Sequence, residues 1–117
     1  MRVLLVDDEK EFVTTLAERL SLRGFTVDFA IRAADALDLA GKNAYNLAIL
    51  DMKMPGTSGL ELKALLEKVQ QGMRFIFLTG HGSEADYVAG CSASACYLVK
   101  PVNIDILITK MHEALQP

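Results

Sequence analysis

Side chains that could bind a metal ion and a phosphate follow four separate apolar runs of this 117-residue sequence. The runs and the side chains that follow them are residues 3–6 with Asp7 and Asp8, 47–50 with Asp51, 75–78 with Thr79, and 97–99 with Lys100. If these runs are parallel strands, their carboxyl ends meet at one edge of a sheet and the side chains converge there. Clustered carboxylates repel one another unless a cation neutralises them, and oxygen ligands favour a hard divalent ion such as Mg²⁺. The spacing therefore predicts a metal site with a hydroxyl group and an ammonium group beside it.

Each of these residues, taken singly, has an ordinary explanation. An acidic residue at a strand end is commonly a solvated loop residue or a helix N-cap, and Asp8 precedes an expected helix. Thr79 or Lys100 alone would usually be a loop residue without a special role. Solvated loop residues would not produce agreement among four strand ends, and the prediction depends on that agreement.

The elements that must position these groups alternate along the chain, as five short apolar runs that are each followed by an amphipathic segment. The expected helical faces lie within residues 12–20, 33–40, 62–69 and 104–115. Residues 25–29 alternate in polarity as an outer strand does, residues 83–90 are expected to form a short helix, and Asn103 is a candidate N-cap for the last helix. Five strand–helix units predict an α/β fold, with a doubly wound five-stranded parallel sheet covered by helices on both faces.

The composition sets limits on the class of protein. Net charge is −3, with both signs interspersed and no basic run, so we expect no direct nucleic-acid binding. No apolar run approaches the ~20 residues of a membrane span, and acidic residues come too early for a signal peptide. We therefore expect a cytoplasmic protein that does not contact membranes. Cys91 and Cys96 lack the spacing of CxxC redox or zinc sites, and we expect two reduced thiols.

Four segments together resemble the receiver domain of two-component response regulators, including the chemotaxis regulators. They are Asp7-Asp8-Glu9, residues 51–59 (DMKMPGTSG), Leu78-Thr79-Gly80 and residues 97–101 (YLVKP). Because they occur in the family's order and spacing, residues 1–117 are expected to form one receiver domain. The resemblance implies a flavodoxin-like (βα)5 fold with strand order 2-1-3-4-5. The chain departs from the family pattern at Gly80, where alanine is frequent, and at residues 93–96, which replace the usual Gly-Ala turn.

The resemblance also implies a phosphorylation reaction. Asp51 would accept a phosphoryl group from a phosphohistidine of a sensor histidine kinase or a phosphotransfer protein, since an ionised carboxylate needs no general base. Asp8, Asp51 and the backbone carbonyl of Lys53 would hold Mg²⁺, with Asp7 acting directly or through a water molecule. The cation would offset the charge that builds on the phosphoryl oxygens.

The remaining motif residues would bind the phosphoryl group or respond to it. Lys100 would pair with one phosphoryl oxygen, and Thr79 would donate its hydroxyl hydrogen to another. Pro101 resembles the family's cis-proline, which directs the preceding ammonium group into the site. Tyr97 resembles the aromatic switch residue, whose ring moves inward when Thr79 moves toward the phosphoryl group. A half-buried strand aromatic without such a role is the alternative for Tyr97.

An output surface is expected on the last helix. Ile106 lies roughly opposite the middle of that helix's apolar stripe, so it should point outward near Lys110. A lone exposed isoleucine is common and often has no function. The resemblance implies instead that Ile106 and Lys110 belong to a partner-binding face, together with residues 83–90 and the strand that carries Tyr97. Phosphorylation would change binding of an output partner or output domain there, and a phosphorylation-dependent homodimer is one form of that change.

Three alternatives share parts of this pattern. An aspartate-nucleophile phosphatase generally has a second acid two residues after the nucleophile, where this chain has Lys53. A flavin-binding flavodoxin-like module has a phosphate loop rich in Ser, Thr and Gly after the first strand, where this chain is acidic. A degenerate receiver that serves only as a scaffold would not need the complete acidic set. We therefore expect a regulatory phosphoacceptor that assists only its own phosphorylation and dephosphorylation, and not an enzyme with an external substrate.

Overall fold

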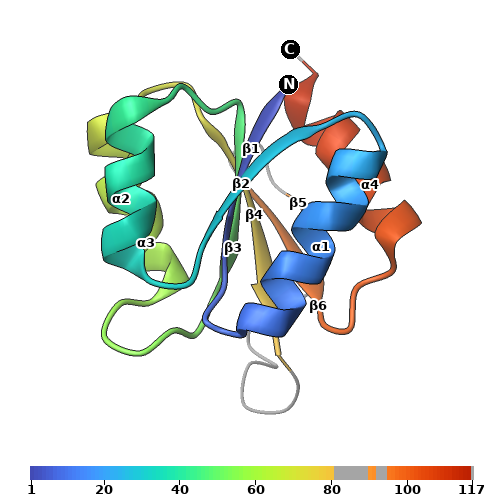
Figure 1. Cartoon of the computed structure of the whole chain (residues 1–117), viewed down its shortest axis with the longest axis horizontal. Helices are drawn as coiled ribbons and strands as arrows, with labels where there is room; N and C mark the ends of the chain where they lie inside the picture. The colour runs from blue at the N-terminus through green and yellow to red at the C-terminus, as the bar shows by residue number, and fades with distance from the viewer. Residues whose placement is uncertain (81–89, 92–94, 117) are drawn as a thin grey trace.

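The computed structural model describes residues 1–80, 90, 91 and 95–116, and its strands form a single sheet (Figure 1). The elements are β1 (Arg2–Val6), α1 (Lys10–Leu22), β2 (Thr26–Ala30), α2 (Ala33–Lys42), β3 (Leu47–Asp51), α3 (Gly59–Val69), β4 (Arg74–Thr79), β5 (Gly90–Cys91), β6 (Ala95–Val99) and α4 (Ile104–Leu115). The strand order is β2-β1-β3-β4-β6-β5, in which β5 alone runs antiparallel to its neighbour. The predicted order 2-1-3-4-5 is confirmed for the five parallel strands.

Helices cover both faces of the sheet, with α2 and α3 on one face and α1 and α4 on the other (Figure 1). Each face has its own apolar core. Val13 and Leu107 belong to the core beneath α1 and α4, whereas Ala36 and Leu62 belong to the core beneath α2 and α3. All residues of β3 are buried, because this central strand is covered on both sides. The continuous apolar run of β3 therefore places Asp51 at the end of a rigid strand.

One predicted element cannot be compared with the structure and another differs from it. Residues 83–89 of the short helix predicted at 83–90 lie outside the described residues, and Gly90 belongs to the short strand β5. The last parallel strand begins at Ala95, earlier than the predicted strand at 97–99. Asn103 caps α4 as predicted, and its side chain accepts hydrogen bonds from two backbone N–H groups of the first turn.

The expectation of a reduced thiol at Cys96 is wrong. Cys96 is disulfide-bonded and only 5% exposed, close to the outer edge of the sheet. In the antiparallel register of β5 and β6, Cys91 lies opposite Cys96. The spacing rules that we applied test for CxxC redox and zinc motifs, so they did not address a disulfide at Cys96. The side chain of Cys91, the other predicted thiol, lies outside the described residues.

The loop after β3 is fixed by the way in which α3 begins. The Ser58 side chain accepts a hydrogen bond from the backbone N–H of Glu61, and the Glu61 carboxylate accepts one from the backbone N–H of Ser58. The next residue, Gly59, packs directly on the end of β3. A Cβ atom added there would lie 2.5 Å from the backbone oxygen of Asp51 and 3.0 Å from the Cα of Met52. The start of α3 therefore touches the strand end that carries Asp51.

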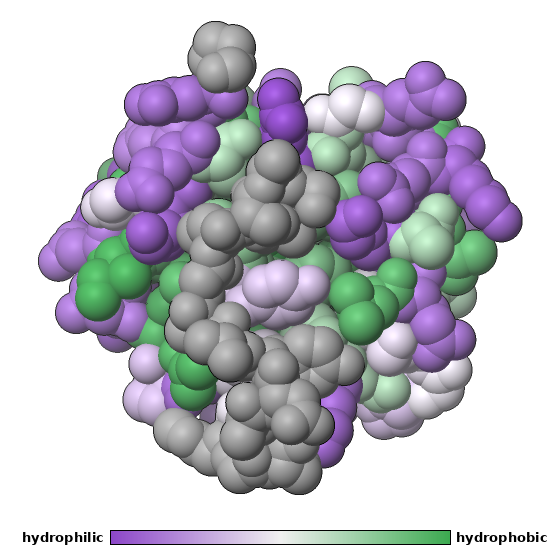
Figure 2. All heavy atoms as spheres, turned by 180° about the vertical axis from the view of Figure 1, so that it is seen from behind, coloured by the Kyte–Doolittle hydropathy of each residue, from purple (hydrophilic) through white to green (hydrophobic). Residues whose placement is uncertain are grey.

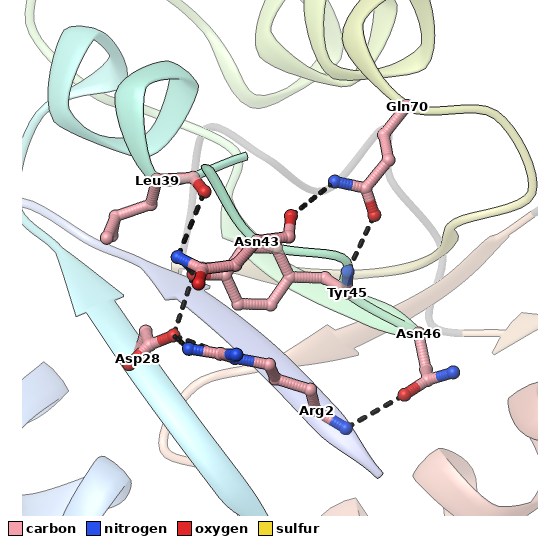
Figure 3. A network of polar contacts seen from close by, with 7 residues as sticks. All are labelled: Arg2, Asp28, Leu39, Asn43, Tyr45, Asn46 and Gln70. Atoms are coloured by element: carbon pink, nitrogen blue, oxygen red, sulfur yellow. Dashed lines mark hydrogen bonds and ion pairs between the residues drawn. The ribbon is translucent and has the colours of Figure 1, made fainter. Parts of the chain in front are cut away.

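A polar network ties the elements together at the opposite, amino-terminal edge of the sheet (Figure 3). The Tyr45 hydroxyl donates to Asp28 over 2.7 Å, and Arg2 forms an ion pair of 2.9 Å with the same carboxylate. Gln70 accepts from the backbone N–H of Tyr45 and donates to the carbonyl of Asn43. Burial, and then the contact with Asp28, raises the pKa of Tyr45 to about 12, so its hydroxyl stays a donor at neutral pH.

The surface is mostly hydrophilic. Seen from behind, polar residues dominate both flanks and apolar residues form separate patches (Figure 2). The longest described helix, α1, has 13 residues, and none of the helices in the described ranges has the length and apolarity needed to cross a bilayer.

Candidate functional site

Four strand ends bring the predicted site residues together at the carboxyl edge of the sheet. Asp7 and Asp8 follow β1, Asp51 ends β3, Thr79 ends β4, and Lys100 follows β6. One carboxylate oxygen from each aspartate lies within 4.8 Å of the other two. Asp7, Asp51 and Thr79 are 2%, 7% and 1% exposed, whereas Asp8 is exposed. The predicted cluster of three carboxylates is therefore confirmed, and it is closed on the protein side and open toward solvent at Asp8.

This donor set fits a hard divalent cation. All three groups offer carboxylate oxygens, which are the ligands that Mg²⁺ and Ca²⁺ prefer. Oxygens around one Mg²⁺ at ~2.1 Å lie roughly 3 to 4 Å apart, close to the spread of the three oxygens here. Two of the three carboxylates are buried, so a cation would also relieve the repulsion between them.

The Lys100 ammonium is the positive charge within this cluster. Its Nζ atom lies 2.7 Å from Oδ2 of Asp7, 3.0 Å from Oε1 of Glu9 and 3.8 Å from Oδ2 of Asp51. The Lys100–Pro101 peptide bond is cis. The contact with Glu9 was not predicted, because nothing in the spacing indicated which way that exposed side chain turns.

Backbone amides hold the two buried carboxylates in place. The backbone N–H of Glu9 donates to Oδ1 of Asp7 over 2.9 Å, and that of Lys53 donates to Oδ1 of Asp51 over 3.3 Å. Each carboxylate has its second oxygen directed toward Lys100. Both carboxylates are thus oriented by the loop that follows their own strand.

Burial dominates the electrostatics of the site. It raises the pKa of Asp51 to about 7, with a further contribution from the charge of Asp7 that Lys100 opposes. Burial also raises the pKa of Asp7, although the hydrogen bond from Lys100 lowers it in part. For Lys100, burial disfavours the charge, but the hydrogen bonds to Asp7 and Glu9 prevail and the pKa is raised. Without a cation, the cluster therefore holds protons that a divalent ion would displace.

Without metal, Asp51 is expected to make the folded protein more stable as the pH falls from about 7.5 to about 5.5. Its pKa is about 7 in the folded protein, against the ordinary value of 3.8 expected on unfolding. Between these values the folded state binds more protons, so acidification favours it, by an amount on the order of 1–2 kcal/mol. Thermal melts in chelator at both pH values, on wild type and Asp51→Asn, measure this contribution. Equal pH responses in the two proteins would contradict it.

Thr79 links the carboxylate cluster to β6. Its hydroxyl group is directed to the carbonyl oxygen of Leu98 at 3.5 Å, a long contact that a better acceptor could replace. The neighbouring Tyr97 is half-buried, and its ring stacks on Phe77 with centroids 5.1 Å apart. The hydroxyl of Thr79 and the ring of Tyr97 are therefore connected through adjacent residues of one strand.

The two residues predicted for the output face lie on α4. Ile106 is 54% exposed, which confirms that it points outward. Lys110 is half-buried, and its ammonium lies 3.3 Å from the Glu113 carboxylate. Neither residue takes part in the carboxylate cluster, but α4 packs against β3, β4 and β6, the strands that carry or precede Asp51, Thr79 and Lys100.

Comparison with known proteins agrees with this geometry. Residues 3–112 match the family model described as the response regulator receiver domain. The transcriptional regulatory protein GlrR of Escherichia coli K12 is 36% identical over 115 residues, covering 97% of this chain and 26% of that protein. The response regulator MprA of Mycobacterium sp. strain KMS is 33% identical over 117 residues, covering 99% of this chain and 51% of that protein. The chain thus spans about a quarter of the length of the first of these curated relatives and about half of the length of the second.

Solved structures of similar fold include a receiver domain and a phosphorylated response regulator. A receiver domain protein from Clostridium thermocellum superposes with a TM-score of 0.84 at 29% identity, covering 97% of this chain and 93% of that one. A response regulator protein from Burkholderia pseudomallei, solved with a phosphorylated aspartic acid, a calcium ion and citrate, gives a TM-score of 0.78 at 34% identity. That match covers 98% of this chain and 66% of the other.

Proposed function

Because this chain belongs to the response regulator receiver domain family, a phosphoacceptor module of two-component signalling and not an enzyme with an external substrate, we propose that Asp51 is the residue phosphorylated. The observation that carries this proposal is the position of its carboxylate. Asp51 is buried at the end of the central strand, one of its oxygens lies in the acidic cluster, and the Lys100 ammonium is 3.8 Å away.

The proposed reaction is phosphoryl transfer from a phosphohistidine of a histidine kinase or phosphotransfer protein. A carboxylate oxygen of Asp51 attacks phosphorus, the phosphorus–nitrogen bond breaks, and the bonding electron pair stays with the imidazole of the donor. Asp7, Asp8 and Asp51, with the backbone carbonyl of Lys53, would hold Mg²⁺. When bound, the cation neutralises the buried carboxylates and the charge on the phosphoryl oxygens. By offsetting the burial that raises the pKa of Asp51 most, and also the charge of Asp7, a bound cation would favour the ionised carboxylate at neutral pH.

Lys100 and Thr79 would then bind the phosphoryl oxygens. Lys100 already lies between Asp7 and Asp51, so a short displacement would bring its ammonium to a phosphoryl group on Asp51. The hydroxyl group of Thr79 would exchange its long contact with the Leu98 carbonyl for a charged acceptor, which makes a stronger hydrogen bond. This exchange changes the contacts of β6 directly beside Tyr97.

We propose that this change alters partner binding through the face that includes Tyr97 on β6 and Ile106 and Lys110 on α4. Phosphorylation would favour the arrangement in which the Thr79 hydroxyl binds the phosphoryl group, which is a shift between two populations. The relatives named above are called transcriptional regulators or response regulators, which supports an output partner or output domain that controls transcription.

Beryllium fluoride with Mg²⁺, a mimic of the acyl phosphate, tests these assignments by backbone NMR. We expect shift changes at Asp51, Thr79 and Lys100, and also along β6 and α4. Thr79→Ala should reduce the changes on β6 and α4 while leaving those at Asp51. Thr14→Ala is the matched control, because Thr14 lies on α1 and its hydroxyl donates to the Lys10 carbonyl. Changes confined to the residues around Asp51 in wild type would refute the switch.

A further inference from the structure

A cation–π contact lies beside the carboxylate cluster. The Nζ atom of Lys100 is 4.7 Å from the ring centroid of Phe12, in the first turn of α1. This is well within the ~6 Å at which an ammonium group is attracted to the face of an aromatic ring. The Lys100 side chain is only 15% exposed, so solvent weakens the attraction less than it would at an open surface.

The Phe12 ring is held by its neighbours. Phe12 is half-buried and packs against the core beneath α1 and α4. It lines a groove with Val102 and Ile104, and Val102 is two residues beyond Lys100 in the same segment. The ring therefore lies beside the ammonium group and lines a groove together with the chain segment that follows Lys100. Packing alone would account for an apolar residue at this position, but it would not require an aromatic face beside the charge.

Binding of a cation should make this contact more important. At present Lys100 has three carboxylate neighbours, and its closest is Asp7. A divalent ion held by the acidic cluster would compete with Lys100 for that carboxylate. Glu9 would remain, but its side chain is 64% exposed, and it attracts the ammonium group toward solvent. The half-buried Phe12 ring is then the contact that keeps Lys100 beside Asp51.

We propose that Phe12 is a positioning residue of the phosphorylation site, whose ring face holds the Lys100 ammonium where it can meet a phosphoryl group on Asp51. This inference rests on the proposed role of Asp51. Loss of one such contact from the transition state slows a reaction by about three- to tenfold. We therefore expect Phe12→Leu to slow phosphoryl uptake by that factor, and Phe12→Tyr, which keeps the ring face, to restore most of the rate.

The test uses acetyl phosphate with Mg²⁺, a small donor that needs no protein docking surface, and follows uptake by intact-mass spectrometry. Ile104→Val is the control, because Ile104 lines the same groove but, as an aliphatic residue, offers no ring face to the Lys100 ammonium. The Mg²⁺ affinity of each variant, measured by NMR titration, should stay at the wild-type value. Equal rates for wild type and Phe12→Leu, or a Phe12→Tyr protein as slow as Phe12→Leu, would refute the positioning role.

A second readout does not depend on the reaction. In the metal-free wild type, the methylene protons beside the Lys100 ammonium should carry an upfield ring-current shift from Phe12, which Phe12→Leu removes. Absence of that shift in wild type would overturn the inference even if the leucine variant did not fold. A wild type that takes up no phosphoryl group but shows the shift would instead refute the proposed role of Asp51, so the two failures are distinguishable.

Discussion

Asp51→Asn is expected to take up no phosphoryl group from acetyl phosphate and Mg²⁺, whereas the wild-type protein should gain one that is labile to base. The amide is a poor nucleophile, and it cannot form the acyl phosphate that an ionised carboxylate forms. Asparagine keeps the size of the side chain, so packing at the end of β3 should change little. Intact-mass spectrometry before and after brief alkaline treatment measures the added phosphoryl group. We expect it in the wild type before the treatment and not at all in Asp51→Asn.

The controls separate the acceptor from its acidic neighbours. Asp38→Asn, at an exposed position of α2, should be phosphorylated as wild type is. Asp8→Asn keeps Asp51 as the acceptor, but its phosphoryl uptake should be slower than that of wild type, because the cation site loses one carboxylate ligand. Phosphoryl uptake by Asp51→Asn at the wild-type level would show that another carboxylate of the cluster is the acceptor.

The site could be predicted from the sequence because its geometry follows from topology. In a parallel sheet, the residues at the carboxyl ends of the strands lie at the same edge. Once the strands were identified, the positions of Asp7, Asp51, Thr79 and Lys100 followed. The apolar runs of the central strands are continuous, since both faces are covered, and that signal is strong in a single sequence. The α/β class and the grouping of these residues at one edge followed from the pattern alone, whereas the strand order came from the family resemblance.

What sequence reasoning missed depends on the direction of individual side chains. The contacts of Glu9 and Phe12 with Lys100 join residues about ninety positions apart, and no periodicity marks them. The same is true of the network around Tyr45, whose members come from separate elements. Strand β5 has only two residues, which is too short for a pattern to appear.

Gly59→Ala is expected to destabilise the protein and also to impair its phosphorylation. The added Cβ would lie 2.5 Å from the backbone oxygen of Asp51, a contact that only a backbone shift can relieve. The cost of such overpacking is roughly 3 kcal/mol in the free energy of unfolding. The reason is the close approach of α3 to β3, and not a left-handed backbone, since Gly59 does not have a positive φ.

Gly41→Ala provides the matched control. Gly41 lies within α2, and an added Cβ would meet no atom within 4 Å, so alanine there should stabilise the helix by about 0.5–1 kcal/mol. Urea denaturation should therefore show that the free energy of unfolding is lower than wild type for Gly59→Ala and higher than wild type for Gly41→Ala.

The backbone movement that relieves the contact in Gly59→Ala would displace either the start of α3 or the end of β3. Asp51 would then lose its alignment with Asp7 and Lys100. Phosphoryl uptake by the folded fraction of Gly59→Ala should consequently be slower than that of Gly41→Ala. A Gly59→Ala protein as stable as Gly41→Ala would show that α3 and β3 do not touch at this point, and the helix would then have no part in positioning Asp51.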